Sequence, residues 1–485
     1  MTAWTRRRFV QASAAGAAGA AASALLPGCA RESATLPTTE GGRLREFTLV
    51  AQPGRANVVG APHPDTAVWT YNGQFPGPVL RAVQGETLRV QFENRLPAPS
   101  TIHWHGIRLP NAMDGVPGLT QPPVPPGGRF TYTFRLPDAG TYWYHPHLDS
   151  SQQLGRGLYG ALVVEEPEPT PFDRELVWVL SDFVLGADAA IAENFGNRFD
   201  AAHAGRIGNT VMINGRVPGE LALRAGERVR LRLVNAANAR IFRLRFGTLP
   251  VTLLALDGHP VDPQPAMDGT VAGVVLAPGM RADVVIDAGP AARHTVIDDY
   301  QRGRAYRLVD LAVTGSGGAA GAASAPRPVP RLRDNPLAEP RLDGAERLRF
   351  VMGGGAMRPA MREAARAGLA WTINGAVHPG HGGGGEAHHG HAAPLYRLKL
   401  GRSYVMEVVN DTRWPHPLHL HGVAFRVLSM NGTPLSLRPW RDTVLLEPDA
   451  RAEIAFVADN PGDWMIHCHI LEHQASGLMA HMRIE

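Results

Sequence analysis

One short pattern occurs three times in the chain, and this repetition constrains the fold more than any other feature. The pattern covers residues 69–73, 211–215 and 371–375, and each copy ends in Asn-Gly. A glycine follows each copy, and a strand-like segment then ends in an asparagine nine residues after that glycine, at Asn94, Asn235 and Asn410. Such self-similarity is typical of related structural units joined along one chain. The repeat therefore predicts three homologous domains.

The residues between these markers indicate β-structure. Val229, Leu231 and Leu233 alternate with arginines, which is the two-residue period of a half-buried strand. The chain also has 54 Gly and 41 Pro, which favour turns over long helices. Short strands at regular spacing with such turns are typical of sandwiches and barrels. We therefore expect an all-β protein with three Greek-key β-sandwich or barrel domains.

The domain boundaries follow from the segments between the copies. A Pro/Glu segment at 165–171 separates the first copy from the second, and a Gly/Ala/Ser/Pro stretch at 314–330 precedes the third. These segments predict a first domain at 45–166, a second domain at 172–314, a linker at 315–340 and a third domain at 341–485. Residues 30–44 are expected to form a tether.

Residues 1–29 have the composition of an export signal. The basic residues Arg6–Arg8 precede a mild apolar stretch rich in Ala and Gly, which would make a poor membrane-spanning helix. The run around Arg6–Arg8 resembles a twin-arginine signal, so we expect the twin-arginine export machinery as a partner and a periplasmic or extracytoplasmic location. Residues 26–29 resemble a lipobox, which would make Cys29 a lipid anchor; otherwise cleavage nearby gives a soluble product.

Charge gives no reason to expect a nucleic-acid partner. The formal net charge is +4, and three of the positive charges are Arg6–Arg8 in the expected signal. The remaining chain is close to neutral, so it lacks the electrostatic basis for binding nucleic acid. The only cysteines are Cys29 and Cys468, so a disulfide framework is excluded unless these two pair.

Paired histidines occur in the first and third copies only. A His-x-His pair begins nine residues after Asn94 and again nine residues after Asn410, and a second pair begins five residues after Gly140 and after Gly462. The eight histidines are His103, His105, His145, His147, His419, His421, His467 and His469. At the equivalent place the second copy has Leu244 and Phe246.

Strand geometry makes each pair a two-pronged ligand, because residues i and i+2 project from the same face of a strand. Eight imidazoles are too many for one zinc ion and suit a cluster of copper ions. A structural zinc site is the weaker alternative. Surface or core polar roles could explain one pair but not four pairs at repeat-equivalent positions.

Cys468 lies between two of these histidines and should point to the opposite face of its strand. There it can meet His416, three residues before His419, and His473, four residues after His469. Two histidines and one cysteine thiolate form the trigonal ligand set of a blue-copper electron-transfer site. One strand would then connect two metal sites.

The four motifs and the three-domain plan resemble the multicopper oxidases, from about residue 45 to the end. The resemblance implies cupredoxin-like domains and four copper ions. It places the type 2 copper on His103 and His419, and the type 1 copper on His416, Cys468 and His473. The type 3 pair would be held by His105, His145, His147, His421, His467 and His469.

Leu478 occupies the family's axial position of the type 1 site, five residues beyond His473. Leucine cannot coordinate, so the resemblance predicts a three-coordinate site with a higher potential than a Met-ligated one. A one-residue shift would bring Met479 there instead.

The resemblance also implies a reaction. Four one-electron oxidations of a reductant at the type 1 site, with transfer through Cys468, are coupled to reduction of O2 to water. Asp114 matches the family's acid beside the cluster, although an Asp-Gly turn explains it equally well. Gln474 stands where several bacterial relatives have glutamate, which leaves the proton route open.

The electron donor is less constrained. A laccase-like enzyme would oxidise phenols or aromatic compounds in a pocket over His416, with Asp442 accepting the phenolic proton. A cuprous oxidase for copper tolerance would collect Cu(I) with Met352, Met357 and Met361, or with the histidine-rich insert at 378–391. A copper-free periplasmic structural protein is the third alternative, and the complete ligand set argues against it.

Overall fold

The computed structural model describes residues 42–268, 271–315, 327–356, 369–378 and 393–485. The expected export signal, Cys29, Met357, Met361 and nearly all of the histidine-rich insert lie outside these residues. No helix in the described ranges is long and apolar enough to cross a membrane. Residues 42–485 form one compact unit.

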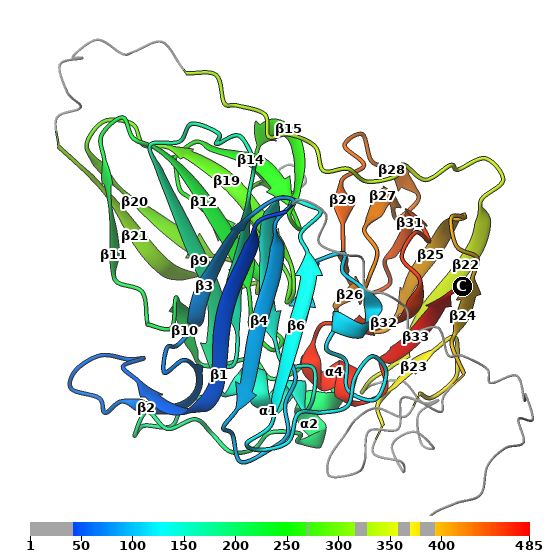
Figure 1. Cartoon of the computed structure of the whole chain (residues 1–485). Coiled ribbons are helices and arrows are strands. Elements are labelled where there is room, and N and C mark those ends of the chain that lie inside the picture. The colour runs from blue at the N-terminus through cyan, green and yellow to red at the C-terminus, as the bar shows by residue number, and fades with distance from the viewer. Residues whose placement is uncertain (1–41, 269–270, 316–326, 357–368, 379–392) are drawn as a thin grey trace, which may run out of the picture. The chain divides into compact units, whose positions relative to one another are not determined.

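The first module consists of two four-stranded sheets (Figure 1). Their strand orders are β2-β1-β4-β6 and β3-β8-β7-β5. The elements are β1 (Leu44–Ala56), β2 (Thr66–Tyr71), β3 (Gly77–Val83), β4 (Thr87–Asn94), β5 (His103–His105), η1 (Asn111–Met113), β6 (Arg129–Arg135), β7 (Gly140–His145), α1 (Ser150–Gly155) and β8 (Gly160–Glu165).

The second module has a six-stranded sheet, β10-β9-β12-β19-β14-β15, a five-stranded sheet, β11-β21-β20-β13-β18, and the small β16-β17 pair. The elements are β9 (Arg174–Phe183), α2 (Arg198–Ala202), β10 (Thr210–Ile213), β11 (Glu220–Arg224), β12 (Arg228–Asn235), β13 (Phe242–Arg245), β14 (Val251–Leu256), β15 (His259–Pro265), β16 (Met267–Asp268), β17 (Val271–Ala272), β18 (Val274–Leu276), β19 (Arg281–Asp287), β20 (Ala292–Asp298) and β21 (Tyr306–Thr314).

The third module has a seven-stranded sheet, β23-β22-β25-β31-β27-β28 with β29 on β27, and a five-stranded sheet, β24-β33-β32-β26-β30. The elements are β22 (Glu346–Gly354), β23 (Trp371–Ile373), β24 (Tyr396–Leu398), β25 (Ser403–Asp411), β26 (His416–Leu420), β27 (Phe425–Met430), β28 (Thr433–Pro434), β29 (Trp440–Arg441), β30 (Thr443–Leu446), β31 (Arg451–Val457), β32 (Gly462–Cys468), α4 (Leu471–Ala475) and β33 (Met479–Ile484).

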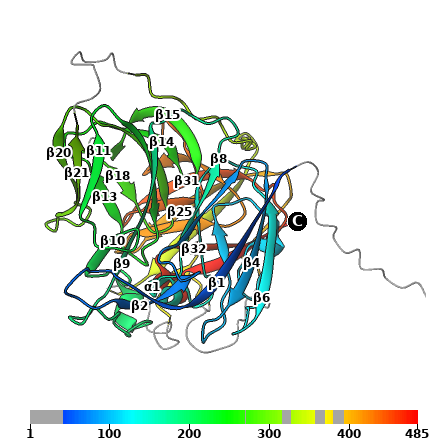
Figure 2. The same ribbon diagram turned by 60° about the vertical axis from the view of Figure 1, so that its left-hand side comes forward.

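The three modules share a topology, and the all-β fold with three sandwich-like units is confirmed. In each module the first strand pairs in parallel with a later strand: β1 with β4, β9 with β12, and β22 with β25. Figure 2 shows β1, β4 and β6 of the first module as neighbouring strands. The exact domain boundaries stay a prediction, because the three modules pack into one unit.

The repeated Asn-Gly pair has the same structural role in all three copies. Asn72, Asn214 and Asn374 have φ angles of 56°, 50° and 51°, and the following glycines also have positive φ. Asparagine and glycine tolerate this left-handed conformation better than other residues. Each asparagine Oδ1 also accepts a hydrogen bond from a backbone N–H of the module's first strand, at 2.7–2.9 Å. The turn therefore ties the second segment of each module to its first strand.

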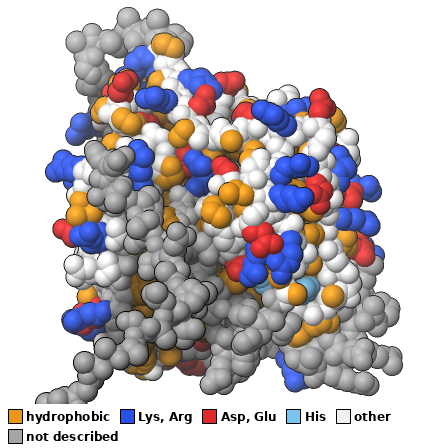
Figure 3. Space-filling view, turned by 45° about the vertical axis from the view of Figure 1, so that its right-hand side comes forward, with side chains coloured by type: hydrophobic (Ala, Val, Ile, Leu, Met, Phe, Trp, Pro, Cys, Tyr) orange, Lys and Arg blue, Asp and Glu red, His pale blue; other side chains and the backbone are white. Residues whose placement is uncertain are grey.

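Hydrophobic packing groups the modules unequally. One continuous core cluster contains side chains of both the first and the third module, such as Trp104 and Leu420, whereas the second module packs around its own cluster. The two histidine-bearing modules are thus held against each other by buried apolar contacts. On the face shown in Figure 3, positive and negative side chains lie next to one another.

Candidate metal centre

The four His-x-His pairs lie on adjacent antiparallel strands within each module or directly after their ends. His103 on β5 is directly opposite His145 on β7, and His419 on β26 is directly opposite His467 on β32. Each module therefore presents four imidazoles from two neighbouring strands of one sheet. All eight side chains are buried, with at most 2% exposed.

The structure brings these two sets of four imidazoles together. The His105 ring stacks on the His419 ring with a centroid distance of 3.7 Å, and His103 stacks on His421 at 4.0 Å. Each stack joins a residue of the first module to one of the third. The eight histidines therefore form one cluster between the modules.

Possible ligand atoms in this cluster fall into groups within 4.8 Å of one another. The groups are His105, His145 and His469; His147, His421 and His467; His103, His105 and His419. This grouping is compatible with the division that the resemblance implies, with His103 and His419 set apart from two triads. The assignment of individual copper types stays a prediction.

Hydrogen bonds orient several of the rings and leave one nitrogen free. The Nδ1–H of His103, His145 and His419 each donates to a backbone carbonyl at 2.8–3.0 Å. The Nε2 atoms of the same three rings are buried and have no hydrogen-bond partner among the described residues. Buried polar atoms are nearly always satisfied, so unpartnered nitrogens within this histidine cluster fit metal ligands.

Burial also keeps most of these imidazoles neutral. It lowers the pKa of six of them well below the usual value, and neighbouring histidines add to the effect; the six are His105, His145, His147, His421, His467 and His469. A neutral imidazole has a free lone pair for a metal ion. The site is therefore ready for a metal at neutral pH.

Asp114 lies beside the cluster, as its predicted role requires. Its carboxylate oxygens are 3.2 Å from His103 Nδ1 and 2.8 Å from His421 Nδ1. The side chain is buried. Asp114 thus contacts one histidine from each half of the cluster, which a simple turn residue would not do.

Cys468 lies on the other face of β32, next to the two predicted partners. Its Sγ is 3.5 Å from His416 Nδ1 and 3.7 Å from His473 Nδ1. The Nε2–H groups point away, to Thr412 Oγ1 at 2.9 Å from His416 and to the His203 carbonyl at 2.7 Å from His473. Burial raises the pKa of the Cys468 thiol and lowers that of His473 to about 3, so the thiolate needs a bound cation.

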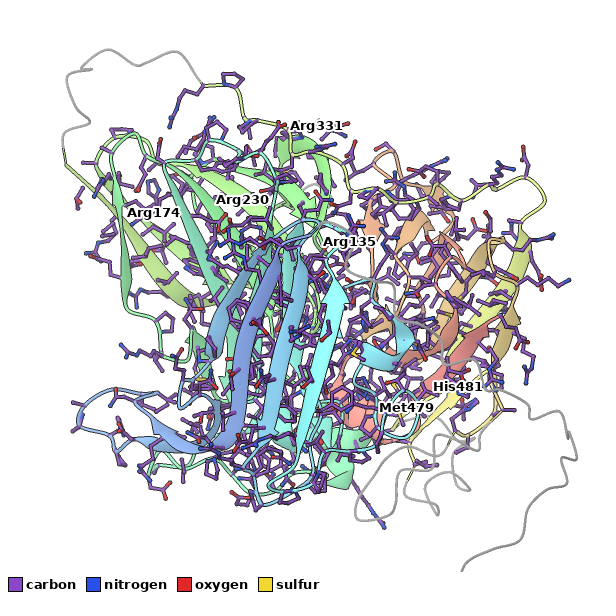
Figure 4. The ribbon with its side chains drawn as sticks, viewed as in Figure 1. Arg135, Arg174, Arg230, Arg331, Met479 and His481 are labelled. Atoms are coloured by element: carbon purple, nitrogen blue, oxygen red, sulfur yellow. The ribbon has the colours of Figure 1, made fainter. Side chains whose placement is uncertain are left out.

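Met479 lies on the face of the β32–β33 pair that carries His467, so Leu478 lies on the face that carries Cys468. The Cys468 N–H donates to the Leu478 carbonyl, and both side chains belong to one buried cluster. Met479 is paired with His467 across β32 and β33, and packs in a separate cluster with Val116. Figure 4 labels Met479 on β33. Because opposite residues share a face, the one-residue shift toward Met479 is not supported.

Asp442 lies elsewhere than the sequence analysis expects. Its carboxylate does not face the region over His416; it is buried beside the histidine cluster, 3.2 Å from His105 Nε2, and pairs with Arg281. Burial alone would raise the pKa of Asp442, but the guanidinium outweighs it and holds that pKa well below its usual range. A buried, ion-paired carboxylate cannot meet a phenol at the type 1 site.

Sequence reasoning missed two contributions of the second module. Gly279 in its turn at 278–281 lies against His469 and His105, and the carbonyl of His203, after α2, accepts a hydrogen bond from His473 Nε2. Residues 126–129 and 278–281 both begin with Pro-Gly and end in Arg, but nothing in the sequence places the second turn against another module. Gln474 is buried, and its Oε1 has no hydrogen-bond partner in the part of the chain that the structure describes.

Comparison with known proteins gives one consistent family. Family models described as multicopper oxidase match residues 54–169, 174–304 and 362–485. The multicopper oxidase MmcO of Mycobacterium tuberculosis is 30% identical over 98% of this chain and 95% of its own length. A laccase of Cryphonectria parasitica is 29% identical over 85% of this chain and 77% of its own length.

A solved structure agrees with these relatives. The crystal structure of a multi-copper oxidase from Pseudomonas thermotolerans is 38% identical, covers 92% of this chain and 100% of that chain, and superposes with a TM-score of 0.78.

Proposed function

The chain belongs to the multicopper oxidase family, and from that premise we propose that it is a laccase-like oxidase of phenols or aromatic compounds. Membership makes it a copper-dependent oxidoreductase that uses dioxygen. The proposal adds the donor class, the number of copper ions and the residues that hold them. One observation supports the proposed oxidase above all. Cys468, the thiolate ligand of the predicted type 1 site, lies between His467 and His469, which belong to the histidine cluster.

Four copper ions fit the donor set. His416, Cys468 and His473 would hold the type 1 copper, and His103 and His419 the type 2 copper. The other six cluster histidines would hold the type 3 pair. When bound, copper supplies one-electron oxidation of the donor and four-electron reduction of dioxygen to water.

The protein residues set the geometry of that chemistry. The short covalent connection through β32 would keep the type 1 site and the histidine cluster at a fixed separation. Asp114 places a carboxylate beside the cluster, where dioxygen reduction would consume protons. Leu478 leaves the type 1 site without a fourth side-chain ligand, which favours a high potential and hence the oxidation of phenols.

An aromatic surface lies over the type 1 histidine and supports an aromatic donor. The His203 carbonyl accepts from His473 Nε2, and the His203 ring stacks on Phe199 with a centroid distance of 4.1 Å. The Phe199 side chain is 69% exposed, and Trp414 contacts His203 from the third module. A planar donor could stack there within a short distance of His473.

Export remains part of this proposal. Residues 1–29 would direct folded protein through the twin-arginine machinery to the periplasm or another extracytoplasmic site, with Cys29 as a lipid anchor. Fractionation of cells expressing the wild type and an Arg6→Lys/Arg7→Lys variant tests this. Equal export of both proteins would contradict it.

The histidine-rich insert provides the test of donor class. We delete residues 380–391 and compare kcat/KM for a phenol and for Cu(I), with and without added Cu(II). The laccase-like proposal expects phenol oxidation to be kept or improved. A protein that oxidises Cu(I) far better than any phenol, and loses that preference on deletion, is a cuprous oxidase instead. Purified protein that contains no copper and shows no blue absorption would support the alternative of a copper-free structural protein.

A further inference from the structure

The second module carries no histidine pair, yet its turn at 278–281 lies against the histidine cluster. Gly279 has a φ of 86°, and a Cβ at this position would lie 2.8 Å from His469 Cδ2 and 3.0 Å from His105 Cε1. Only a residue without a side chain can approach these two rings so closely. The close approach of Gly279 therefore places Arg281, two residues later, near the histidine cluster.

Arg281 follows on this turn and is fully buried. Its Nη1 donates to Asp442 Oδ1 at 2.8 Å and its Nη2 to Asp442 Oδ2 at 2.6 Å, a two-pronged ion pair between the second and third modules. The remaining guanidinium donors reach the backbone carbonyls of Thr141, Gly279 and Asp257 at 2.9–3.1 Å. The guanidinium therefore has one fixed orientation.

Asp442 transmits this orientation to a predicted copper ligand. Its Oδ1 lies 3.2 Å from His105 Nε2 and also accepts from Thr443 Oγ1 at 2.7 Å. His105 thus has its Nε2 occupied and its Nδ1 buried without a partner, which is the reverse of His103, His145 and His419. The carboxylate decides which nitrogen of His105 remains free for a metal.

We propose that Arg281 is a positioning residue for the copper cluster, which acts through Asp442 to fix the ring of His105. The inference rests on the proposed copper sites and gives the ligand-free second module a function in them. Without the guanidinium, Asp442 is a buried carboxylate with no cation to hold it in place, and the His105 ring loses its fixed partner.

A purely structural ion pair is the alternative, and the chain offers a matched control. Arg230 is also in the second module, where Figure 4 labels it, and its side chain is 2% exposed. It pairs with Asp283 at 2.7 Å and with Glu166 at 2.9 Å. In the described part of the chain these acids contact none of the predicted copper ligands. Loss of Arg230 therefore removes a buried ion pair of the same module without disturbing His105, and Arg232 still pairs with Asp283 at 3.0 Å.

The experiment compares Arg281→Met, Arg281→Lys and Arg230→Met as full-length proteins reconstituted with copper. The readouts are copper bound per chain at fixed free copper, the blue absorption of the Cys468 site, the electron paramagnetic resonance of the cluster, and the midpoint of thermal unfolding. Arg281→Met should weaken copper binding at the cluster by about 10- to 100-fold while the blue absorption stays. Arg281→Lys keeps the positive charge but cannot form the two parallel hydrogen bonds to Asp442, so it should show a smaller loss of copper binding.

Arg230→Met should lower the unfolding midpoint but leave the cluster's copper affinity and spectrum unchanged. Equal copper affinity in Arg281→Met and Arg230→Met, or wild-type affinity and spectra in both Arg281 variants, would overturn the inference. If Arg281→Met does not fold, Arg281→Lys decides on the same readouts. Wild-type protein that binds no copper would instead refute the proposed function, so the two failures can be told apart.

Discussion

Asp114 Oδ2, in the first module, lies 2.8 Å from Nδ1 of His421, in the third. The other carboxylate oxygen is 3.2 Å from His103 Nδ1. One acid thus touches both halves of the histidine cluster, in a region from which solvent is excluded. This contact suits a group that holds ligands of both modules in place and handles protons consumed at the cluster.

Asp114→Asn should slow dioxygen reduction while leaving oxidation of the donor intact. The amide is close in size but cannot take up a proton, so we expect oxygen consumption to fall by about 10²- to 10⁴-fold. Anaerobic bleaching of the blue absorption by a phenol should keep its wild-type rate. Asp138→Asn is the control, because Asp138 is buried in the same module and pairs with Arg108 instead. A similar loss in both variants would count against a role for Asp114 at the cluster.

Leu478→Met should lower the reduction potential of the type 1 site. A thioether facing Cys468 would supply the missing fourth ligand and favour the oxidised metal. Redox titration of the blue absorption measures the change. Leu398→Met provides the control, since Leu398 is buried in the same sheet on β24. A potential that stays the same in Leu478→Met would show that Leu478 is not the axial residue.

The metal-free protein should lose stability steeply as the pH falls below about 6.5. Burial lowers the pKa of the cluster histidines in the folded state, so the unfolded chain binds protons that the folded chain does not. Stability is therefore fully present above the unfolded pKa and decreases by roughly 1.4 kcal/mol per pH unit for each such histidine.

Urea unfolding of chelator-treated protein at several pH values measures this slope. His105→Gln and His145→Gln should each make it shallower by about one proton. A free energy of unfolding that is flat between pH 7.5 and 5.5 would contradict burial of neutral imidazoles.

Phe199→Ala should weaken the use of aromatic donors without affecting the copper sites. Loss of a stacking surface next to His203 should raise KM for a bulky phenol by roughly 2- to 10-fold, while kcat and the blue absorption stay. Leu342→Ala removes an apolar side chain from a residue that is 42% exposed, shortly before β22, and serves as the control. An unchanged KM for phenols of every size would exclude Phe199 from the donor site.

Short sequence patterns were enough to predict much of the fold and most of the candidate metal ligands. Asn72, Asn214 and Asn374 could be recognised as one repeated turn because the left-handed conformation at each position restricts the residue type. The histidine pairs were recognisable because alternate residues of a strand share a face. The same two-residue period placed Cys468 opposite its neighbours, and these rules depend on only a few residues each.

Only the tertiary structure decided how the modules complete each other's sites. Arg281 and Asp442 are 161 residues apart, and each belongs to a module whose local sequence gives no sign of the other. Asp442 was therefore expected near a substrate, although burial and the guanidinium place it beside His105. Contacts of this kind depend on how whole sheets pack together. That packing is the sum of many weak interactions between residues far apart in the chain, so no short segment of the sequence predicts it.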